Sequence, residues 1–145
     1  MKTLRSARLI VVDNAGRLLL FRYHDEHQPP FWATVGGQLQ GDENYRAAAV
    51  RELQEETGFD AEIGPFLRER DEVYAVARRD PERWIEHYFL VRCATIEPLD
   101  QAGWTDEERT TIRAWRWWTL DELRTTDETI LPAWIPDLLA EALAE

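Results

Sequence analysis

Residues 37–59 read GQLQGDENYRAAAVRELQEETGF, and this stretch decides the fold and the chemistry that the sequence predicts. Three glutamates, Glu52, Glu55 and Glu56, lie near its end. On a helix with about 100° of rotation per residue, their carboxylates share an arc of about 100°. Like charges so close together repel each other, and a chain gains from the arrangement only when a strong cation binds there. Hard divalent metal ions prefer oxygen ligands, so the stretch predicts a metal site.

The same stretch predicts a helix with Asp42 as its N-cap, which ends near Thr57 with Gly58 in the C′ position. Arg51 is placed one turn before Glu55, where the two side chains can pair. The face that packs on a sheet is expected to carry three apolar residues, Ala47, Val50 and Leu53.

The spacing resembles the Nudix box, which is Gly, five residues, Glu, seven residues and then Arg-Glu-apolar-x-Glu-Glu-x-Gly-apolar. Every specified position matches, and the matching residues are Gly37, Glu43, Arg51, Glu52, Leu53, Glu55, Glu56, Gly58 and Phe59. The resemblance implies the Nudix fold, an α+β arrangement with a mixed β-sheet sandwiched between α-helices. A solvated acidic helix face is the other interpretation of the three glutamates, and the complete spacing favours the resemblance.

Members of this family typically hydrolyse a diphosphate linked to another group, usually a nucleoside. By resemblance, the catalytic set is Glu55, Glu56, Glu52 and Arg51. The metal-binding set implied is Gly36, Gly37, Glu52, Glu55 and Glu56, with a backbone carbonyl from one of the glycines. The cofactor implied is Mg²⁺ or Mn²⁺, in one or more copies, which acts as a Lewis acid, a water activator and an orienting template. Glu43 is interpreted as support for the site and not as a primary ligand.

The sequence leaves the general base open. In many relatives a Glu from a late loop or strand takes this role. In the branch that shares the Arg-Trp-Trp run beginning at Arg116, an acidic residue is often found two positions earlier, and here that position is Ala114. Three acidic residues earlier in the same region are alternatives, Asp106, Glu107 and Glu108. Otherwise Glu55 or Glu56 must serve.

Composition restricts the class of protein. The chain has 145 residues, 44% of them apolar, which predicts one globular domain over residues 1–145. The net charge of −11 argues against binding to nucleic acid polymers or anionic membranes, although a metal ion would admit a small phosphorylated substrate. The single cysteine fits a reducing cytosol, and the apolar run Leu9–Val12 is too short for a signal peptide or a membrane span. We therefore expect a cytoplasmic protein.

Hydrophobic alternation and turn residues place the remaining elements. Strands are expected at residues 5–13, 17–23, 31–35, 61–68, 72–77, 84–94 and 114–118, with a turn at 78–83. Thr119 followed by Glu122 is typical of a capping box that begins a short helix. A terminal helix is expected over residues 136–144, with Leu138, Leu139, Ala142 and Leu143 facing inward.

Four residues outside the box are candidates for substrate contacts: Arg22, Trp32, Tyr74 and Arg78. Arg22 is interpreted either as a phosphate ligand or as a member of a surface ion pair. Trp32 and Tyr74 are candidates for stacking on a base, with packing in the core as the alternative. Arg78 either contacts phosphate or lies in a solvated turn.

The expected function is that of a Nudix pyrophosphohydrolase, a metal-dependent hydrolase that cleaves the phosphoanhydride bond of a nucleoside diphosphate linked to another moiety. Its partner is then a small nucleotide, and a homodimer is compatible with the resemblance. The alternative is a catalytically silent Nudix-fold domain that senses nucleotides or binds a partner, which Ala114 favours and the intact box disfavours. Nucleoside triphosphates, nucleotide sugars, dinucleoside polyphosphates and ADP-ribose are all compatible with the sequence.

Overall fold

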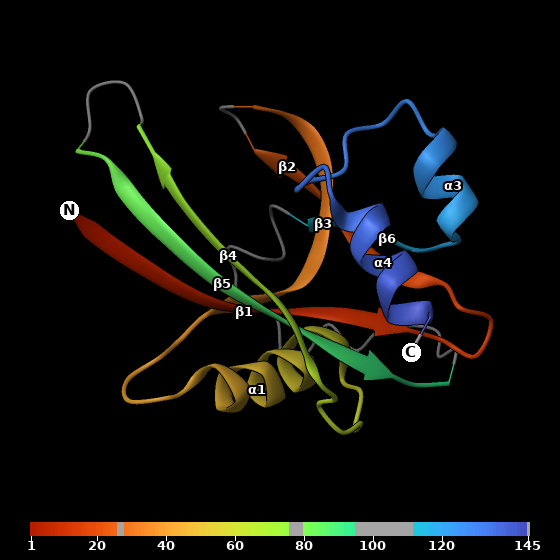
Figure 1. The fold of residues 1–145 in the computed structure, drawn as a ribbon, viewed down its shortest axis with the longest axis horizontal. Helices are drawn as coiled ribbons and strands as arrows, with labels where there is room; N and C mark the ends of the chain where they lie inside the picture. The colour runs from red at the N-terminus through yellow and green to blue at the C-terminus, as the bar shows by residue number, and fades with distance from the viewer. Residues whose placement is uncertain (26–27, 76–79, 95–111, 145) are drawn as a thin grey trace.

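The computed structural model describes residues 1–25, 28–75, 80–94 and 112–144. These residues form a six-stranded mixed sheet with the strand order β4-β5-β1-β3-β2-β6, and helices flank it (Figure 1). The strands are β1 (Lys2–Val12), β2 (Leu18–Asp25), β3 (Gln28–Gln38), β4 (Phe66–Tyr74), β5 (Glu82–Arg92) and β6 (Ile112–Trp118). The helices are α1 (Tyr45–Thr57), α3 (Leu120–Thr125) and α4 (Ile135–Leu143). No helix within these ranges is long and apolar enough to cross a membrane.

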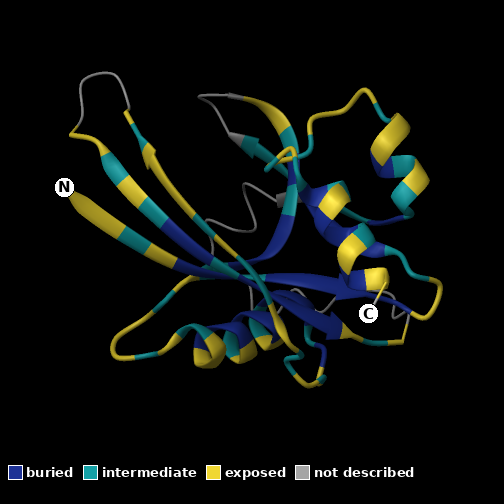
Figure 2. Ribbon diagram, viewed as in Figure 1, coloured by how far each residue is buried: buried dark blue, intermediate teal, exposed yellow. Residues whose placement is uncertain are grey.

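Each face of the central strand β1 has its own hydrophobic core. Leu9 lies in the core on the α1 side, together with Leu53 of that helix. Ile10 lies in the core on the α4 side, together with Leu138. Figure 2 shows buried residues concentrated in the middle of the sheet and exposed residues on the outer sides of the helices. The expected mixed sheet between helices is therefore confirmed.

The register of β1 determines which side chains meet at the site. β1 pairs antiparallel with β3 and parallel with β5. In this register Arg8 lies between Gly36 of β3 and Tyr88 of β5. Because side chains alternate along a strand, Arg8 shares a face with Ile10 and Val12, the face that α4 covers farther along the sheet.

The first turn of α1 differs from the expectation. The N-cap is Asn44, whose side chain accepts a hydrogen bond from the Ala47 N–H, and Asp42 lies before it in a turn. The prediction of Asp42 as N-cap is wrong because the short side chain of Asn44 is the one placed to satisfy a free N–H of the first turn. Gly58 ends the helix in the left-handed conformation with φ of 73°, as expected.

The buried face of α1 also differs from the expectation. The buried residues of the helix are Ala48, Ala49, Glu52, Leu53, Glu56 and Thr57. Of the three apolar residues expected on this face, Leu53 is buried, but Ala47 is exposed and Val50 is 56% exposed. The physical reason is that Glu52 and Glu56 face the sheet, which turns Val50 toward solvent.

One long strand replaces two predicted ones. The sequence predicts strands at 61–68 and 72–77, but β4 continues through the charged residues between them and pairs with β5. Ion pairs hold this charged part on both faces, Arg70 with Glu86 on one and Asp71 with Arg83 on the other. Cross-strand pairs of opposite charge stabilise a sheet, so the charges extend the strand and do not break it.

Elsewhere the boundaries shift and one side chain turns outward. β3 is longer than the predicted 31–35, because Gly36 and Gly37 continue to pair with β1. The capping box of Thr119 and Glu122 is present at the start of α3. Leu143 is 37% exposed, so the prediction that it faces inward is wrong, since it lies in the last turn of α4.

Candidate active site

Two adjacent glycines of β3 create room for close contacts on both sides of the strand. Gly36 has φ of 148°, and a Cβ atom there would lie 2.2 Å from the carbonyl oxygen of Ala7. A Cβ atom on Gly37 would lie 2.5 Å from the carboxylate oxygen Oε1 of Glu52. A side chain larger than hydrogen is therefore excluded at Gly36 by the backbone of β1, and at Gly37 it would displace the carboxylate of Glu52, which lies directly against β3.

The glutamates of α1 differ in their exposure. Glu56 is fully buried, and its Oε1 accepts a hydrogen bond of 3.2 Å from the Gly36 N–H. Glu52 is 7% exposed, whereas the side chain of Glu55 is 37% exposed. Glu52 and Glu56 therefore face β3, and Glu55 lies at the edge of the group where solvent reaches it.

Arg51 joins three carboxylates, and we name the group of Arg51, Glu43, Glu52 and Glu55 the Arg51 cluster. The Arg51 guanidinium donates to Glu43 at 2.8 and 2.9 Å, to Glu52 at 2.8 Å and to Glu55 at 3.1 Å. It also donates to the carbonyl oxygen of Gln38 at 3.0 Å. The predicted pairing of Arg51 with Glu55 is confirmed, and Glu43 is a partner of the same arginine.

The pKa values of Arg51 and Glu43 shift in the directions that favour their charged forms. Hydrogen bonding to Glu43 raises the pKa of Arg51, and the carboxylates of Glu52 and Glu55 contribute to the same effect. Hydrogen bonding to Arg51 lowers the pKa of Glu43. The ion pair of Arg51 and Glu43 is therefore held in its charged form near pH 7.

The donor set fits a hard divalent cation. Carboxylate oxygens are the ligands that Mg²⁺ and Mn²⁺ prefer, and the missing Cβ atom of Gly37 leaves the β3 backbone close to Glu52. Within the described ranges, no three acidic, histidine or cysteine side chains converge as a formed metal centre. The oxygens are instead engaged by Arg51 and by the Gly36 N–H.

Arg22 lies on β2 within an ion pair. Its Nη1 lies 2.9 Å from His24 Nε2, and its Nε lies 3.5 Å from Glu128 Oε1. In the β2–β6 register it faces Ala114, the late position where an acidic residue was considered. The sequence left two interpretations of Arg22, a phosphate ligand or a member of a surface ion pair. The contact with Glu128 matches the ion pair.

Trp32 and Tyr74, the two stacking candidates, lie in different surroundings. Trp32 is 6% exposed, contacts Trp118 edge-on at 5.1 Å and donates to Glu128 Oε1 at 3.1 Å. This location favours the interpretation of Trp32 as a packing residue. Tyr74 is half-buried at the end of β4 and contacts Trp84 edge-on at 5.7 Å. The remaining candidates lie outside the described residues: Arg78, Asp106, Glu107 and Glu108.

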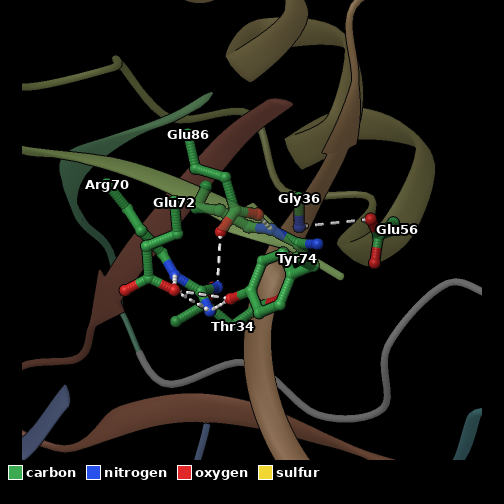
Figure 3. A network of polar contacts seen from close by, with 8 residues as sticks. Thr34, Gly36, Glu56, Arg70, Glu72, Tyr74 and Glu86 are labelled. Carbon is green, nitrogen blue, oxygen red and sulfur yellow. Dashed lines mark hydrogen bonds and ion pairs between the residues drawn. The ribbon is translucent and has the colours of Figure 1, made fainter. Parts of the chain in front are cut away.

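Sequence reasoning missed a polar network on the face of the sheet beside Gly36 (Figure 3). We name it the Glu86 network, and its members are Arg8, Arg70, Glu72, Tyr74 and Glu86. Glu86 is 2% exposed and accepts 2.8 Å hydrogen bonds from Arg8 and from Arg70, one on each carboxylate oxygen. Burial alone would raise the pKa of Glu86, but the charges and hydrogen bonds of Arg8 and Arg70 outweigh it and lower the pKa. The signal in the sequence that could have revealed this network is Glu86, a charged residue at an inward position of the predicted strand 84–94.

Comparison with known proteins identifies the family. The model of the NUDIX domain matches residues 2–138, so the chain belongs to this family, as its box predicted. The CTP pyrophosphohydrolase of Escherichia coli K12 is 36% identical over 58 residues, which are 39% of this chain and 43% of that protein. The match therefore spans less than half of that relative.

Solved structures share the fold over nearly the whole chain. The solution structure of the E. coli ORF135 protein is 25% identical, with a TM-score of 0.63 over 99% of this chain and 91% of that one. The MutT NUDIX hydrolase from Burkholderia pseudomallei is 23% identical, with a TM-score of 0.72 over 97% of this chain and 98% of that one. The latter likeness supports the fold alone. The named relatives include the pyrophosphohydrolase class that the sequence predicted.

Proposed function

We propose that this chain is a divalent-metal-dependent Nudix pyrophosphohydrolase that cleaves a phosphoanhydride bond in a nucleoside diphosphate derivative. One observation carries the proposal: the carboxylates of α1 gather around a single arginine and against two glycines of β3. The excess of negative charge at this place has no role in packing, since apolar side chains would bury the same surface at lower cost. A bound cation would give this excess of negative charge a role.

The metal would be held by Glu52, Glu55 and Glu56 with a backbone carbonyl of Gly36 or Gly37, and Mg²⁺ or Mn²⁺ suits these oxygens. When bound, such an ion supplies Lewis acidity and a template for the phosphates. Arg51 orients Glu52 and Glu55, because it donates to both. Gly36 orients Glu56 through its N–H.

The remaining chemistry is a proton transfer and the exclusion of water from the buried side of the site. Glu55 is the most exposed of the three glutamates, and we assign it to accept the proton of the attacking water. Glu56 is buried, so its carboxylate stays oriented by Gly36 through the reaction. The acidic residues at 106–108 are alternative proton acceptors, and Glu55→Gln distinguishes them, because a rate within threefold of wild type assigns the role elsewhere.

The experiment is a measurement of phosphate and pyrophosphate release from a panel of nucleotides, each with Mg²⁺, with Mn²⁺ and with EDTA. Cytidine triphosphate comes first because a relative carries that activity in its name. Nucleotide sugars, dinucleoside polyphosphates and ADP-ribose follow. The matched control is Glu56→Gln purified in the same way, which keeps the size of the side chain and removes its charge.

Three outcomes are informative. Metal-dependent release by the wild type that is lost in Glu56→Gln supports the proposal, and the ratio of pyrophosphate to phosphate locates the cleaved bond. Equal release by both proteins indicates a contaminating phosphatase and contradicts it. Nucleotide binding without release supports the silent sensing domain, for which Ala114 is the motivating residue.

A homodimer, which the resemblance allows, is a separate proposal. Val50, Phe66 and Val73 are large apolar residues that are at least half exposed, and a partner would bury such side chains. Sedimentation velocity at micromolar concentration tests it, and a monomer at all concentrations would contradict it.

A further inference from the structure

Arg8 lies at the point where the sheet meets the carboxylate site. In the β1–β3 register its Cα is paired with Gly36, whose N–H binds Glu56. A Cβ atom on Gly36 would lie 2.9 Å from Cδ of Arg8, so the stem of the arginine passes directly over this glycine. The side chain of Arg8 therefore lies against the glycine whose N–H orients Glu56, on the face of the sheet opposite the core that contains Leu53 of α1.

Glu86 fixes the orientation of Arg8. Arg8 Nε donates to Glu86 Oε2 at 2.8 Å, and Arg8 Nη1 donates to the carbonyl oxygen of Thr34 at 3.3 Å. The other oxygen of Glu86 is occupied by Arg70 at 2.8 Å. Because Glu86 is 2% exposed and bonded on both oxygens, its carboxylate has no freedom to move away from Arg8.

The two arginines differ in how much of their donor capacity remains. An arginine has five N–H donors. Arg70 donates to Glu86, to Glu72 through both Nε and Nη2, and to the hydroxyl of Tyr74. Within the part of the chain that the structure describes, Arg8 uses Nε and one hydrogen of Nη1, which leaves three donors. Its side chain is 20% exposed, so solvent reaches part of it.

The balance of charge in the Glu86 network also favours a ligand at Arg8. The buried part of the network has two guanidiniums and one carboxylate, and Glu72, which balances the second guanidinium, is 46% exposed in its side chain. Glu72 contacts Arg70 and Tyr74, so among the described residues it leaves the three remaining N–H donors of Arg8 beside Gly36 unoccupied. A group rich in acceptor oxygens is the ligand that such donors bind.

We propose that Arg8 is a substrate-binding residue, which donates to an acceptor oxygen of the nucleotide, and that Glu86 is its positioning residue. The proposal rests on the function proposed above and extends it to the substrate. Both a phosphate and the carbonyl group of a base provide such an oxygen, and the probes below distinguish them. The competing explanation is that the network only joins β1, β4 and β5.

The experiment is calorimetric titration of the full-length protein in Mg²⁺ with two probes, the nonhydrolysable α,β-methylene analogue of cytidine triphosphate and cytidine itself. The variants are Arg8→Gln, Arg8→Lys, Glu86→Gln and the double variant Arg8→Gln/Glu86→Gln. The matched control is Arg83→Gln, which breaks an ion pair with Asp71 on the opposite face of the same two strands. Melting curves verify that each variant is folded.

Arg8→Gln is expected to weaken binding of the analogue by about tenfold to hundredfold, the usual loss for a hydrogen bond to a charged group. Arg8→Lys recovers part of the affinity, and Arg83→Gln leaves it unchanged. If cytidine binding falls equally, the contact is to the base, and if it does not change, the contact is to phosphate. A folded Arg8→Gln variant with wild-type affinity for the analogue overturns the proposal.

The role of Glu86 has its own readout. Glu86→Gln is expected to weaken binding by about threefold to tenfold, and the double variant is expected to bind no more weakly than Arg8→Gln alone, because a positioning residue acts through its partner. Additive losses overturn the positioning role. If Glu86→Gln does not fold, the shorter Glu86→Asp takes its place in the same cycle.

The further inference and the proposed function fail in different ways. Binding of the analogue that depends on Arg8, without turnover of any nucleotide, overturns the enzymatic function and supports the inference. Turnover that is abolished by Glu56→Gln but unchanged in rate and KM by Arg8→Gln supports the enzymatic function and overturns the inference. A wild-type protein that binds no nucleotide overturns both.

Discussion

The Arg51 cluster and the buried part of the Glu86 network both adjoin the Gly36–Gly37 pair, but their ratios of charge are opposite; Glu72, which balances Arg70, lies in the exposed part of the network. In the first, one guanidinium serves three carboxylates. In the buried part of the second, one carboxylate serves two guanidiniums. Ion pairs alone need neither imbalance, because equal numbers would satisfy both partners. We propose that ligands supply the missing charges, a cation at the first and an acceptor-rich group at the second.

The largest expected effect is on turnover at the α1 carboxylates. Glu56→Gln is expected to lower kcat by about 10²- to 10³-fold, because the amide keeps the contact with Gly36 but loses the charge that a metal requires. Steady-state kinetics with saturating Mg²⁺ measures it. Glu62→Gln, an exposed glutamate beyond α1, is the control. Similar rates for the two variants would mean that the charge of Glu56 has no role in turnover.

The next effect is on stability and depends on pH. Glu86→Gln is expected to lower Tm by about 10 °C at pH 7, because two guanidiniums lose a buried carboxylate. The pKa of Glu86 is lower in the folded chain than its ordinary value of 4.5, so its contribution is complete above that pH and is lost as the pH falls through the folded pKa.

Thermal melts of Glu86→Gln and wild type between pH 7 and pH 3 measure this dependence. The two melting temperatures should converge toward the acid end of the range. A constant difference would mean that the amide disturbs packing and that the charge of Glu86 contributes nothing.

A smaller effect is expected at Arg51. Arg51→Gln should lower Tm by about 5 °C in EDTA, since three carboxylates lose their shared donor. Added Mg²⁺ should then raise Tm more in the variant than in the wild type, because a cation replaces the missing charge. Differential scanning fluorimetry with and without Mg²⁺ measures both shifts. Identical metal-induced shifts in the two proteins would argue against a cation site at this cluster.

The smallest effect is expected at Glu72. Its ion pair with Arg70 is exposed, so Glu72→Gln should change Tm by no more than about 2 °C. Removal of its negative charge should lower KM for an anionic substrate by at most about threefold. Glu69→Gln is the matched control, because Glu69 lies on β4 like Glu72 but contacts His87. A higher KM in Glu72→Gln alone would indicate that Glu72 itself contacts the substrate.

The two clusters also differ in how far the sequence predicts them. Arg51 and Glu55 lie one turn apart on α1, and helical periodicity brings them together regardless of the rest of the fold. Arg8, Arg70 and Glu86 are distant in sequence, and only the order of β4, β5 and β1 in the sheet makes them neighbours. Spacing along the chain holds no information on that order.

The errors within the predicted regions have a related origin. The sequence predicts Val50 on the packed face of α1 because apolar residues usually fill that face, but Glu52 and Glu56 occupy it here. The sequence predicts two strands, 61–68 and 72–77, on either side of the charged part of β4, because it does not show which residues of β5 pair with those charges. In both cases a charged group lies where a hydrophobic pattern predicts an apolar one, and its partner is the missing information.

The pairing of Arg8 with Glu86 has a consequence for folding. A slip of one residue between β1 and its neighbours would turn Arg8 into the apolar core beside Leu53 and would bring Leu9 out. Such a slipped sheet would bury an arginine without its carboxylate, at a cost of about 3–5 kcal/mol. The ion pair therefore discriminates against misaligned strands, and the correct alignment of β1 with β5 is selected by charge as well as by hydrophobicity.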